Sequence, residues 1–261
     1  MTTNDKLISA CNSNWTITLS RLARAIQGGT VEEMNGVTIV KTGIRSPEFN
    51  LVFAVNKVGE IAEILQTVRT IFADQDLPWQ LITSPKNEDR MAPMIEEMRL
   101  TPHEIDPGMV LDPLPATPPP APSELEIREV QSQEDLIAFF EVSRLSFGDD
   151  ANLPELETAR FSSSSTASFS GALYLGLVDG KPAATSLRST TGSTAGIYLV
   201  GTIAEFRRRG FGEAMTWRAA IDGRKEGCTI SCLEASEMGR SVYEKMGYKK
   251  VIEYKVWRPN K

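Results

Sequence analysis

Three arginines and two glycines gather in the stretch FRRRGFG, residues 206–212. The stretch follows a short apolar run, AGIYLVGTI (195–203), that is typical of a strand, and it leads into a helix-compatible segment, residues 210–227. The first-turn N–H groups of a helix have no partners within the helix, and glycine lets an anion approach the backbone closely. The pattern therefore predicts a site for a phosphate or a similar anion at the start of this helix.

Two other interpretations of this turn compete with an anion site. Arginines before a helix are also typical of a turn that water simply solvates. A Rossmann dinucleotide turn is disfavoured, because the chain has no G-x-G-x-x-G followed about 20 residues later by an acidic residue. The segments downstream must decide between the anion site and the solvated turn.

The overall composition, with 41% hydrophobic and 24% charged residues, is that of an ordinary globular protein. At 261 residues the chain is long enough for two domains. The formal net charge of −6 disfavours nucleic acid as a partner and permits a cationic substrate such as an amine. Because no stretch has the pattern of a signal peptide or a membrane span, we expect a cytoplasmic protein with no membrane partner.

Cysteine and histidine are too sparse to predict a disulfide framework or a metal site. The three cysteines, Cys11, Cys228 and Cys232, are scattered, and Cys228 and Cys232 flank a predicted strand, where they fit as small buried hydrophobes. His103 is the one histidine of the chain. With no Cys/His cluster we expect no metal.

The first half of the chain predicts alternating helices and strands. Apolar residues recur at spacings of three and four between residues 4 and 27, which favours a helix that Gly28 and Gly29 end. The later elements follow from the same kind of pattern. We expect strands at 37–44, 50–56 and 79–83, helices at 57–75 and 87–99, and an extended segment that ends near Leu111.

Proline marks the boundary between the two halves. Residues 113–122, PLPATPPPAP, hold six of the 15 prolines of the chain, a run that favours an extended, semi-rigid spacer. The predicted division is a domain at 1–112, a linker at 113–123 and a second domain at 124–261.

The second half predicts the order β-α-α-β-β-β-α-β-α-β. Ser132 is the expected cap of the first helix, and Asp179-Gly180 is a strong two-residue hairpin signal between the strands at 172–178 and 181–189. The remaining elements are a strand at 125–130, an acidic loop at 148–157, a helical piece with Arg160, the strand at 195–203, the helix after the glycine turn, a strand at 229–235, a helix at 236–247 and a strand at 248–257.

Two motifs in this half resemble the GNAT-type N-acetyltransferases. Arg207-x-x-Gly210-x-Gly212 resembles the family's acyl-CoA pyrophosphate signature, and SEMGRSVYEKMGY (236–248) resembles its penultimate helix. The order of elements is also that of the family, and the resemblance covers roughly residues 125–258. It implies an α/β (α+β) fold, with a mixed, mostly antiparallel central sheet flanked by helices, and acetyl-CoA as cosubstrate.

The resemblance also implies which residues contact acetyl-CoA. In the family, the strand before the glycine turn splays from its neighbour, and its free backbone N–H groups bind the pantetheine arm and the acetyl carbonyl. Ser236 stands where the family often has an asparagine, so it either contacts CoA or simply caps the helix. The implied set is Val200, Gly201, Thr202, Arg207, Arg208, Arg209, Gly210, Phe211, Gly212, Glu213 and Ser236.

Two residues are candidates for the proton transfers. Tyr243 matches the family tyrosine that protonates the departing CoA sulfur, although a tyrosine at this position also fits as a packing residue. Many relatives carry a glutamate base on the strand before the glycine turn, but 195–203 has none. Glu234 is therefore the candidate base, with a water relay or an already neutral amine as alternatives. Asp149 and Asp150 lie where the family borders its acceptor and are candidates for selecting a cation.

The two halves also resemble each other. MIEEMRL (94–100) aligns with VYEKMGY (242–248), which puts Ile95 opposite Tyr243, and the segment before the first-half helix lacks R-x-x-G-x-G. We therefore expect two GNAT-like domains, of which the first is a degenerate, inactive copy. The expected function is N-acetyl transfer to a small amine or a peptide N-terminus, by a monomer or a homodimer. The alternative is a catalytically inactive acyl-CoA-binding sensor or interaction protein.

Overall fold

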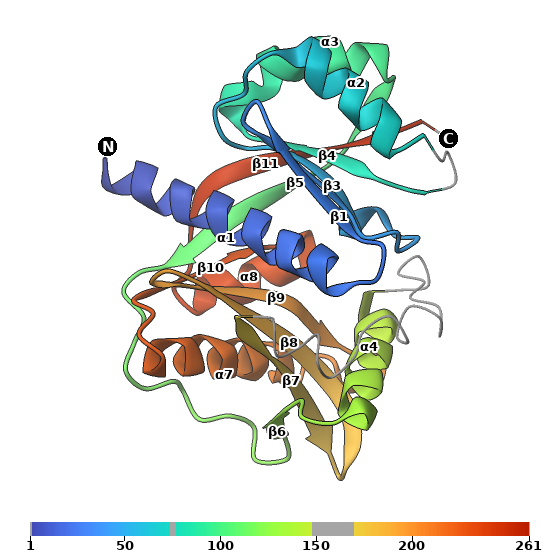
Figure 1. Ribbon diagram of the computed structural model, residues 1–261. Helices are drawn as coiled ribbons and strands as arrows, with labels where there is room; N and C mark the ends of the chain where they lie inside the picture. The colour runs from blue at the N-terminus through green and yellow to red at the C-terminus, as the bar shows by residue number, and fades with distance from the viewer. Residues whose placement is uncertain (1, 74–76, 148–169, 261) are drawn as a thin grey trace.

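The computed structural model describes residues 2–73, 77–147 and 170–260. These residues form one sheet of eleven strands, in the order β1-β2-β3-β4-β11-β5-β10-β9-β8-β7-β6 (Figure 1). The strands are β1 (Thr30–Met34), β2 (Val37–Lys41), β3 (Asn50–Ala54), β4 (Gln80–Thr83), β5 (Leu100–Leu111), β6 (Glu126–Glu129), β7 (Gly171–Val178), β8 (Lys181–Thr191), β9 (Thr194–Thr202), β10 (Ile230–Glu234) and β11 (Lys249–Pro259).

Six described helices flank this sheet, so the predicted mixed α/β architecture is confirmed. They are α1 (Thr3–Ala25), α2 (Ile61–Ile71), α3 (Glu88–Glu97), α4 (Gln133–Phe147), α7 (Phe211–Lys225) and α8 (Glu237–Lys245). Short 3-10 turns precede β3, α3 and α7, namely η1 (Pro47–Phe49), η2 (Pro85–Asn87) and η3 (Ala204–Phe206). None of the described helices has the length and hydropathy needed to span a bilayer.

The N-terminal half, residues 2–111, and the C-terminal half, residues 125–260, share a pattern of connections. In each, an antiparallel pair leads through a crossover helix to a parallel neighbour. In the N-terminal half these are β2–β3 and then β3–β4, with α2 between the parallel strands. In the C-terminal half they are β8–β9 and then β9–β10, with α7 between them.

The last strand of each half lies within the other half. β5, from the N-terminal half, pairs with β10 and β11, while β11, from the C-terminal half, pairs with β4 and β5. The backbone ladder therefore runs through both halves without a break. The predicted domain boundary at the linker does not coincide with a gap in the sheet.

The two faces of the sheet around this junction are covered by different helices. On one face, α1 lies across the strands where the halves meet, and its Trp15 packs edge-on against Phe53 and Tyr254 (Figure 1). The other face of the C-terminal half packs against α7 and α8, whose side chains share one core cluster. We call these the α1 face and the α7 face.

Several local predictions are confirmed. Asp179 and Gly180 both have positive φ, +50° and +75°, as a type I′ hairpin turn requires. The Ser132 hydroxyl accepts a hydrogen bond from the Asp135 N–H at 3.0 Å and so caps α4. The strand β1 was not predicted, and the expected helical piece with Arg160 lies outside the described residues.

The proline-rich linker packs against the C-terminal half. The carbonyl oxygen of Leu114 accepts a 2.6 Å hydrogen bond from Arg224, and Leu114 itself is buried. At the other end, Pro122 lies beside Gly210, and Glu124 forms an ion pair with Arg209. The linker therefore runs along α7 to the glycine turn.

The strand exchange predicts that the C-terminal half depends on the N-terminal half for folding. A fragment of residues 120–261 lacks both β4 and β5, which leaves the backbone groups of β10 unpaired along one side and those of β11 unpaired along both sides. We expect this fragment to show no cooperative thermal unfolding in calorimetry. As a control, the full chain cut at a protease site inserted after Pro118 keeps both pieces and should unfold as the intact protein does. A fragment with the melting temperature of the full chain would contradict the prediction.

Candidate functional site

The glycine turn begins α7 with a left-handed residue. Gly210 is the N-cap at φ +79°, and no side chain caps the helix. The N–H groups of the first turn have no intrahelical partner, so they are available to an anion. Gly212 faces the end of β9, where a Cβ built on it would lie 3.8 Å from Val200 and 4.0 Å from Thr202. The structure thus brings Val200, Thr202, Gly210 and Gly212 of the predicted set together.

The three arginines of the turn have different surroundings. Arg207 donates to the carbonyl oxygens of Thr202 (3.1 Å) and Ser146 (2.8 Å), so it ties β9 to the end of α4. Arg209 pairs with Glu124 and lies over the Phe206 and Phe211 rings. In the described part of the chain, Arg208 has no side-chain partner and is exposed. Arg208 is therefore the arginine best placed to meet a phosphate.

The other predicted cosubstrate residues also have structural partners. Phe211 is buried and anchors the first turn of α7 in the core. Glu213 accepts a 3.4 Å hydrogen bond from the Trp217 indole, and Ser236 caps α8 by accepting from the Gly239 N–H at 3.2 Å. Gly201 packs on the end of α4, where a Cβ would come within 2.8 Å of Ser146.

A gap opens between β9 and β10 at their carboxyl ends. The parallel pairing of these strands ends at Gly196 opposite Cys232. Beyond that point β9 pairs only with β8, and its register shifts there, with Leu199 at a positive φ of +48°. A bulge of this kind turns the strand and leaves backbone groups unpaired on one side. The gap therefore presents free backbone groups of β9 in front of the glycine turn.

Tyr243 lies on the α7 face of this gap. Its ring is buried and packs edge-on against Tyr248 at 5.9 Å. Burial raises the pKa of Tyr243 to about 12, and a hydrogen bond with the Thr216 side chain opposes the shift. Thr216 itself bonds the carbonyl oxygen of Gly212 at 2.8 Å, so the hydroxyl of Tyr243 is placed near the glycine turn. The tyrosine remains protonated at neutral pH and can act as an acid.

Glu234 ends β10 on the opposite, α1 face. Both of its carboxyl oxygens are buried and have no hydrogen-bond partner among the described residues. Burial raises the pKa of Glu234 well above its usual value, and charges on Cys11 and Asp106 act in the same direction. A buried carboxyl without a partner is costly, and such groups concentrate at functional sites.

The neighbours of Glu234 fix its place relative to Tyr243. The adjacent residues Leu233 and Ala235 belong to the same core cluster as Tyr243. Because side chains alternate along a strand, Glu234 points to the other face. The parallel register places it across the gap from Tyr198, just before the bulge. The gap therefore has a tyrosine on one face and a carboxyl on the other.

Part of the α1 face comes from the N-terminal half. Asn14 of α1 accepts a 2.6 Å hydrogen bond from the Tyr198 hydroxyl, and Asn12 accepts one from Tyr254 at 2.7 Å. Asp106 of β5 also lies on this face. Sequence reasoning missed these residues, because only the strand exchange and the position of α1 bring them to the C-terminal half. Asp149 and Asp150 lie outside the described residues.

The equivalent strand ends of the N-terminal half are tied together. The amide of Asn87 donates to the carbonyl oxygen of Ala54 at 2.8 Å and also bonds Asn56 and Ser84. β3 and β4 stay paired to their last residues, Ala54 and Thr83. Among its described residues, the N-terminal half therefore has no gap like the one between β9 and β10.

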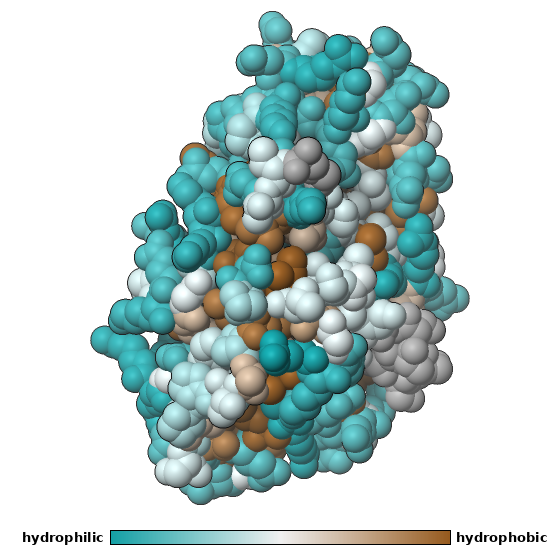
Figure 2. Space-filling view, turned by 90° about the vertical axis from the view of Figure 1, so that its left-hand side faces the viewer, coloured by the Kyte–Doolittle hydropathy of each residue, from teal (hydrophilic) through white to brown (hydrophobic). Residues whose placement is uncertain are grey.

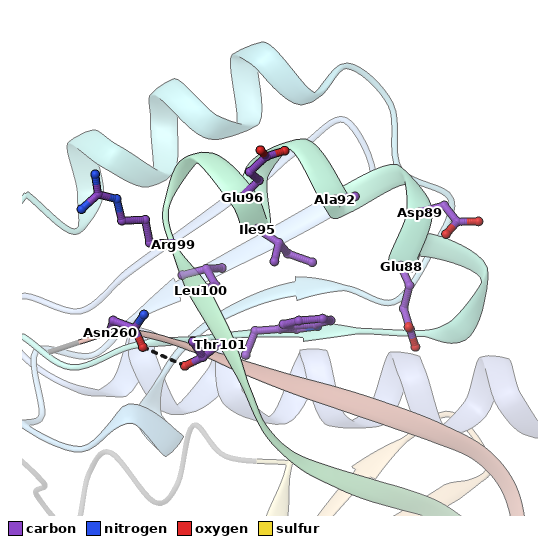
Figure 3. Close-up of a pocket in the computed structure, with 10 residues that line it drawn as sticks. Glu88, Asp89, Ala92, Ile95, Glu96, Arg99, Leu100, Thr101 and Asn260 are labelled. Atoms are coloured by element: carbon purple, nitrogen blue, oxygen red, sulfur yellow. Dashed lines mark hydrogen bonds between the residues drawn. The ribbon is translucent and has the colours of Figure 1, made fainter.

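Described residues of the N-terminal half, together with β11 and the end of the chain, line two surface hollows. One, of about 480 Å³, lies between α3 and the ends of β5 and β11; Ile95 points into it and Thr101 bonds Asn260 (Figure 3). The other, of about 660 Å³, lies between the first turns of α1, the ends of β3 and β4, and β11. On the side where α1 begins, hydrophobic residues gather along the middle of the surface, between hydrophilic margins (Figure 2). No described group of three or more His, Cys, Asp or Glu is arranged to hold a metal ion.

The comparisons with known proteins agree with this geometry. The model of the family described as "Acetyltransferase (GNAT) domain" matches residues 126–251. These residues form a GNAT domain. The match includes the glycine turn, the gap and both proton-transfer candidates, and it supports acyl transfer as the class of reaction. A search of curated protein sequences gives no significant match.

Solved structures share the fold over almost the whole chain. A GCN5-related N-acetyltransferase from Kribbella flavida has a TM-score of 0.68 at 18% identity, over 95% of this chain and 96% of its own. One from Sphaerobacter thermophilus has a TM-score of 0.58 at 15% identity, over 97% and 92%. A tandem GNAT protein from the clavulanic acid biosynthesis pathway has a TM-score of 0.56 at 12% identity, over 99% and 97%. The arrangement of the GNAT domain with the N-terminal half is therefore a known fold.

The buried carboxyl of Glu234 predicts a pH-dependent effect on stability. A carboxyl whose pKa is raised in the folded state destabilises the protein once the pH exceeds its pKa in the unfolded chain, because only the unfolded chain then ionises freely. Glu234→Gln removes this cost. At pH 8 we expect the melting temperature of the variant to exceed that of the parent, by about 2–4 °C for each kcal/mol recovered. At pH 4 the two melting temperatures should be equal. A variant less stable than the parent at both pH values would mean that the carboxyl has a stabilising partner.

Proposed function

We propose that the GNAT domain transfers an acetyl group from acetyl-CoA to a primary amine, by direct attack within a ternary complex. The observation that carries this proposal is the convergence at the β9–β10 gap. The glycine turn and a buried tyrosine are on the α7 face of the sheet, and a carboxyl without a hydrogen-bond partner among the described residues ends β10 on the α1 face. The N-terminal half acts as a degenerate GNAT-like unit that does not bind acetyl-CoA.

The cosubstrate would lie with its pyrophosphate at the glycine turn. The N–H groups at the start of α7 donate to the phosphate oxygens, and Arg208 adds a positive charge. The pantetheine arm then enters the gap, where backbone N–H groups between Val200 and Thr202 bond it and the acetyl carbonyl. Fixed backbone dipoles stabilise the negative charge that develops on that oxygen during attack.

The two proton-transfer residues would act from opposite faces. An alkylammonium has a pKa of about 10, so it must lose a proton before its nitrogen can attack, and Glu234 accepts that proton. The nitrogen then bonds the acetyl carbon, the carbon–sulfur bond breaks, and Tyr243 donates its proton to the thiolate. The second proton lost by the nitrogen restores Tyr243. Overall, the ammonium and acetyl-CoA give the amide, the free thiol and one proton.

The N-terminal half lacks each part of this machinery. Asn87 holds the ends of β3 and β4 together, where the GNAT domain has a gap. The residue aligned with Tyr243 is Ile95, which has no proton to donate. The segment before α2, AVNKVGE (54–60), has no arginine or glycine pair. We propose that its role is to complete the sheet and the acceptor side.

One observation favours the alternative of an acyl-CoA-binding sensor without catalysis. The carboxyl oxygens of Glu234 are shut off from water, and a carboxyl with a raised pKa stays protonated until a cation or a high pH removes its proton. The two functions differ in a simple assay. Incubation with acetyl-CoA and a panel of primary amines releases free CoA only if the domain is an enzyme, whereas a sensor binds acetyl-CoA without release.

Tyr243→Phe tests the proposed acid. The change keeps the ring and removes the hydroxyl, so we expect kcat to fall by about 10²–10⁴-fold while the Kd for acetyl-CoA stays unchanged. The matched control is Tyr248→Phe, which removes a buried hydroxyl that bonds Ser231 at 2.7 Å. The control should lower the melting temperature and leave kcat nearly intact. Near-full turnover by Tyr243→Phe would reduce Tyr243 to a packing residue.

A further inference from the structure

We propose that Asp106, supplied by the N-terminal half, is the second carboxyl of the acceptor site. Together with Glu234 it would hold the acceptor as its ammonium ion and select amines without a carboxylate near the reacting nitrogen. The inference rests on the proposed acetyl transfer and adds a substrate class to it. Asp106 would position and select the acceptor, while Glu234 takes its proton.

Strand register puts the two carboxyls on one face. Glu234 pairs with Gly108 across the antiparallel β10–β5 ladder, and Asp106 is two residues further along β5. Residues directly opposite each other on paired strands share a face of the sheet, and so do residues two apart along one strand. Glu234 and Asp106 are therefore diagonal neighbours on one face, and such pairs lie about 7–8 Å apart. On the other side, Asp106 pairs with Tyr254, whose hydroxyl bonds Asn12 of α1. Both carboxyls are therefore on the α1 face, opposite Tyr243.

The depths of the two carboxyls differ in a way that suits an entering amine. β10 ends at Glu234, so Asp106 lies just past the end of that strand. Asp106 is partly exposed, whereas both oxygens of Glu234 are buried. A cation arriving from solvent would meet Asp106 first and Glu234 second. The glycine between them on β5 adds no side chain of its own.

Neither carboxyl has a positive partner in the described structure. No hydrogen bond or ion pair joins Asp106 to another described side chain. Arg258 is the cation that acts on it, but Arg258 is already paired with Glu48 at 2.8 Å and bonds Gln80 at 3.0 Å. Burial, with Glu104 and Glu48 nearby, raises the pKa of Asp106 to about 7.

The remaining groups that face Glu234 cannot supply a positive charge either. They come from every element around it, and each is neutral or acidic. They are Cys11 on α1, Tyr198 on β9, Cys232 on β10, Tyr254 on β11 and Asp106 on β5. The site thus has two carboxyls and lacks a counter-ion. A bound ammonium would supply that counter-ion and, by its charge, lower the pKa of Glu234 toward the value a base needs.

The experiment compares acceptors in the full-length protein and its Asp106→Asn variant. The probes are straight-chain primary amines, terminal diamines and ω-amino carboxylates of matched lengths, each with acetyl-CoA. We expect the parent to prefer the amines and diamines, and Asp106→Asn to reduce that preference by about tenfold through a higher KM for these acceptors. The KM for acetyl-CoA should not change.

The pH dependence of kcat/KM distinguishes an acceptor-selecting role of Asp106 from a merely structural one. The negative charge of Asp106 raises the pKa of Glu234, so its removal should move the acid limb of kcat/KM to lower pH. Glu104→Gln is the matched control, because it removes a carboxylate from the same strand at a more exposed position. At pH 8 it should leave the preference for amines nearly unchanged, because Asp106 keeps its charge there. Since Glu104 helps to raise the pKa of Asp106, this control is compared by its acceptor preference only. Asp106→Glu restores the charge and should recover most of the preference.

Two outcomes would overturn the inference. One is a parent enzyme that prefers the ω-amino carboxylates, and the other is an Asp106→Asn variant that behaves like Glu104→Gln. Failure of the underlying function looks different: no amine in the panel would then release CoA from any variant, although acetyl-CoA still binds. Melting temperatures of all variants at pH 8 confirm that each is folded at the assay temperature.

Discussion

The exchange of terminal strands joins the two halves of the chain into one sheet. β5 lies between β10 and β11, and β11 lies between β4 and β5, so each half completes the hydrogen-bond ladder of the other. Buried backbone N–H and C=O groups are costly when unpaired, which makes the exchange hard to undo. The position of Asp106 beside Glu234 follows directly from it. The proposed acceptor site would thus belong to neither half alone.

The same sheet explains how one gap presents different groups on its two faces. Side chains alternate between the faces of a strand, so consecutive residues at the end of β10 point to α7 and to α1 in turn. The α7 face carries the glycine turn and Tyr243, while the α1 face carries Glu234. In the N-terminal half, Asn87 bridges the corresponding strand ends, and the residues that the structure describes there leave no comparable gap.

Local signals in the sequence predicted local structure well. The Asp179-Gly180 turn and the Ser132 cap each depend on a few neighbouring residues, and the structure shows both. The strand exchange could not be predicted in this way, because β5 is compatible with pairing inside its own half. The role proposed for Asp106 depends on that exchange, and no local sequence pattern indicates it.

The site was predictable in part for the same reason. The motifs in the sequence indicated where the glycine turn and the helix with Tyr243 lie in the GNAT domain. They did not indicate which of the three arginines has no side-chain partner among the described residues. Arg207 donates to two carbonyl oxygens, one of them at the end of α4. Arg209 pairs with Glu124, which the linker brings to it. The bulge at Leu199 also lacks a sequence signal, since leucine rarely adopts a positive φ. The hydrogen bond from Asn87 to Ala54 joins residues that are far apart in the sequence, so it could be found only in the folded structure.

In the proposed function, acetyl-CoA binds at the β9–β10 gap of the GNAT domain and not at the strand ends of the N-terminal half. Amide hydrogen exchange followed by mass spectrometry, with and without acetyl-CoA, tests it on the intact chain. The account predicts slower exchange at residues 198–202 and 208–213, and no change at residues 54–57 and 84–87. Protection at the ends of β3 and β4, with none at the glycine turn, would contradict it.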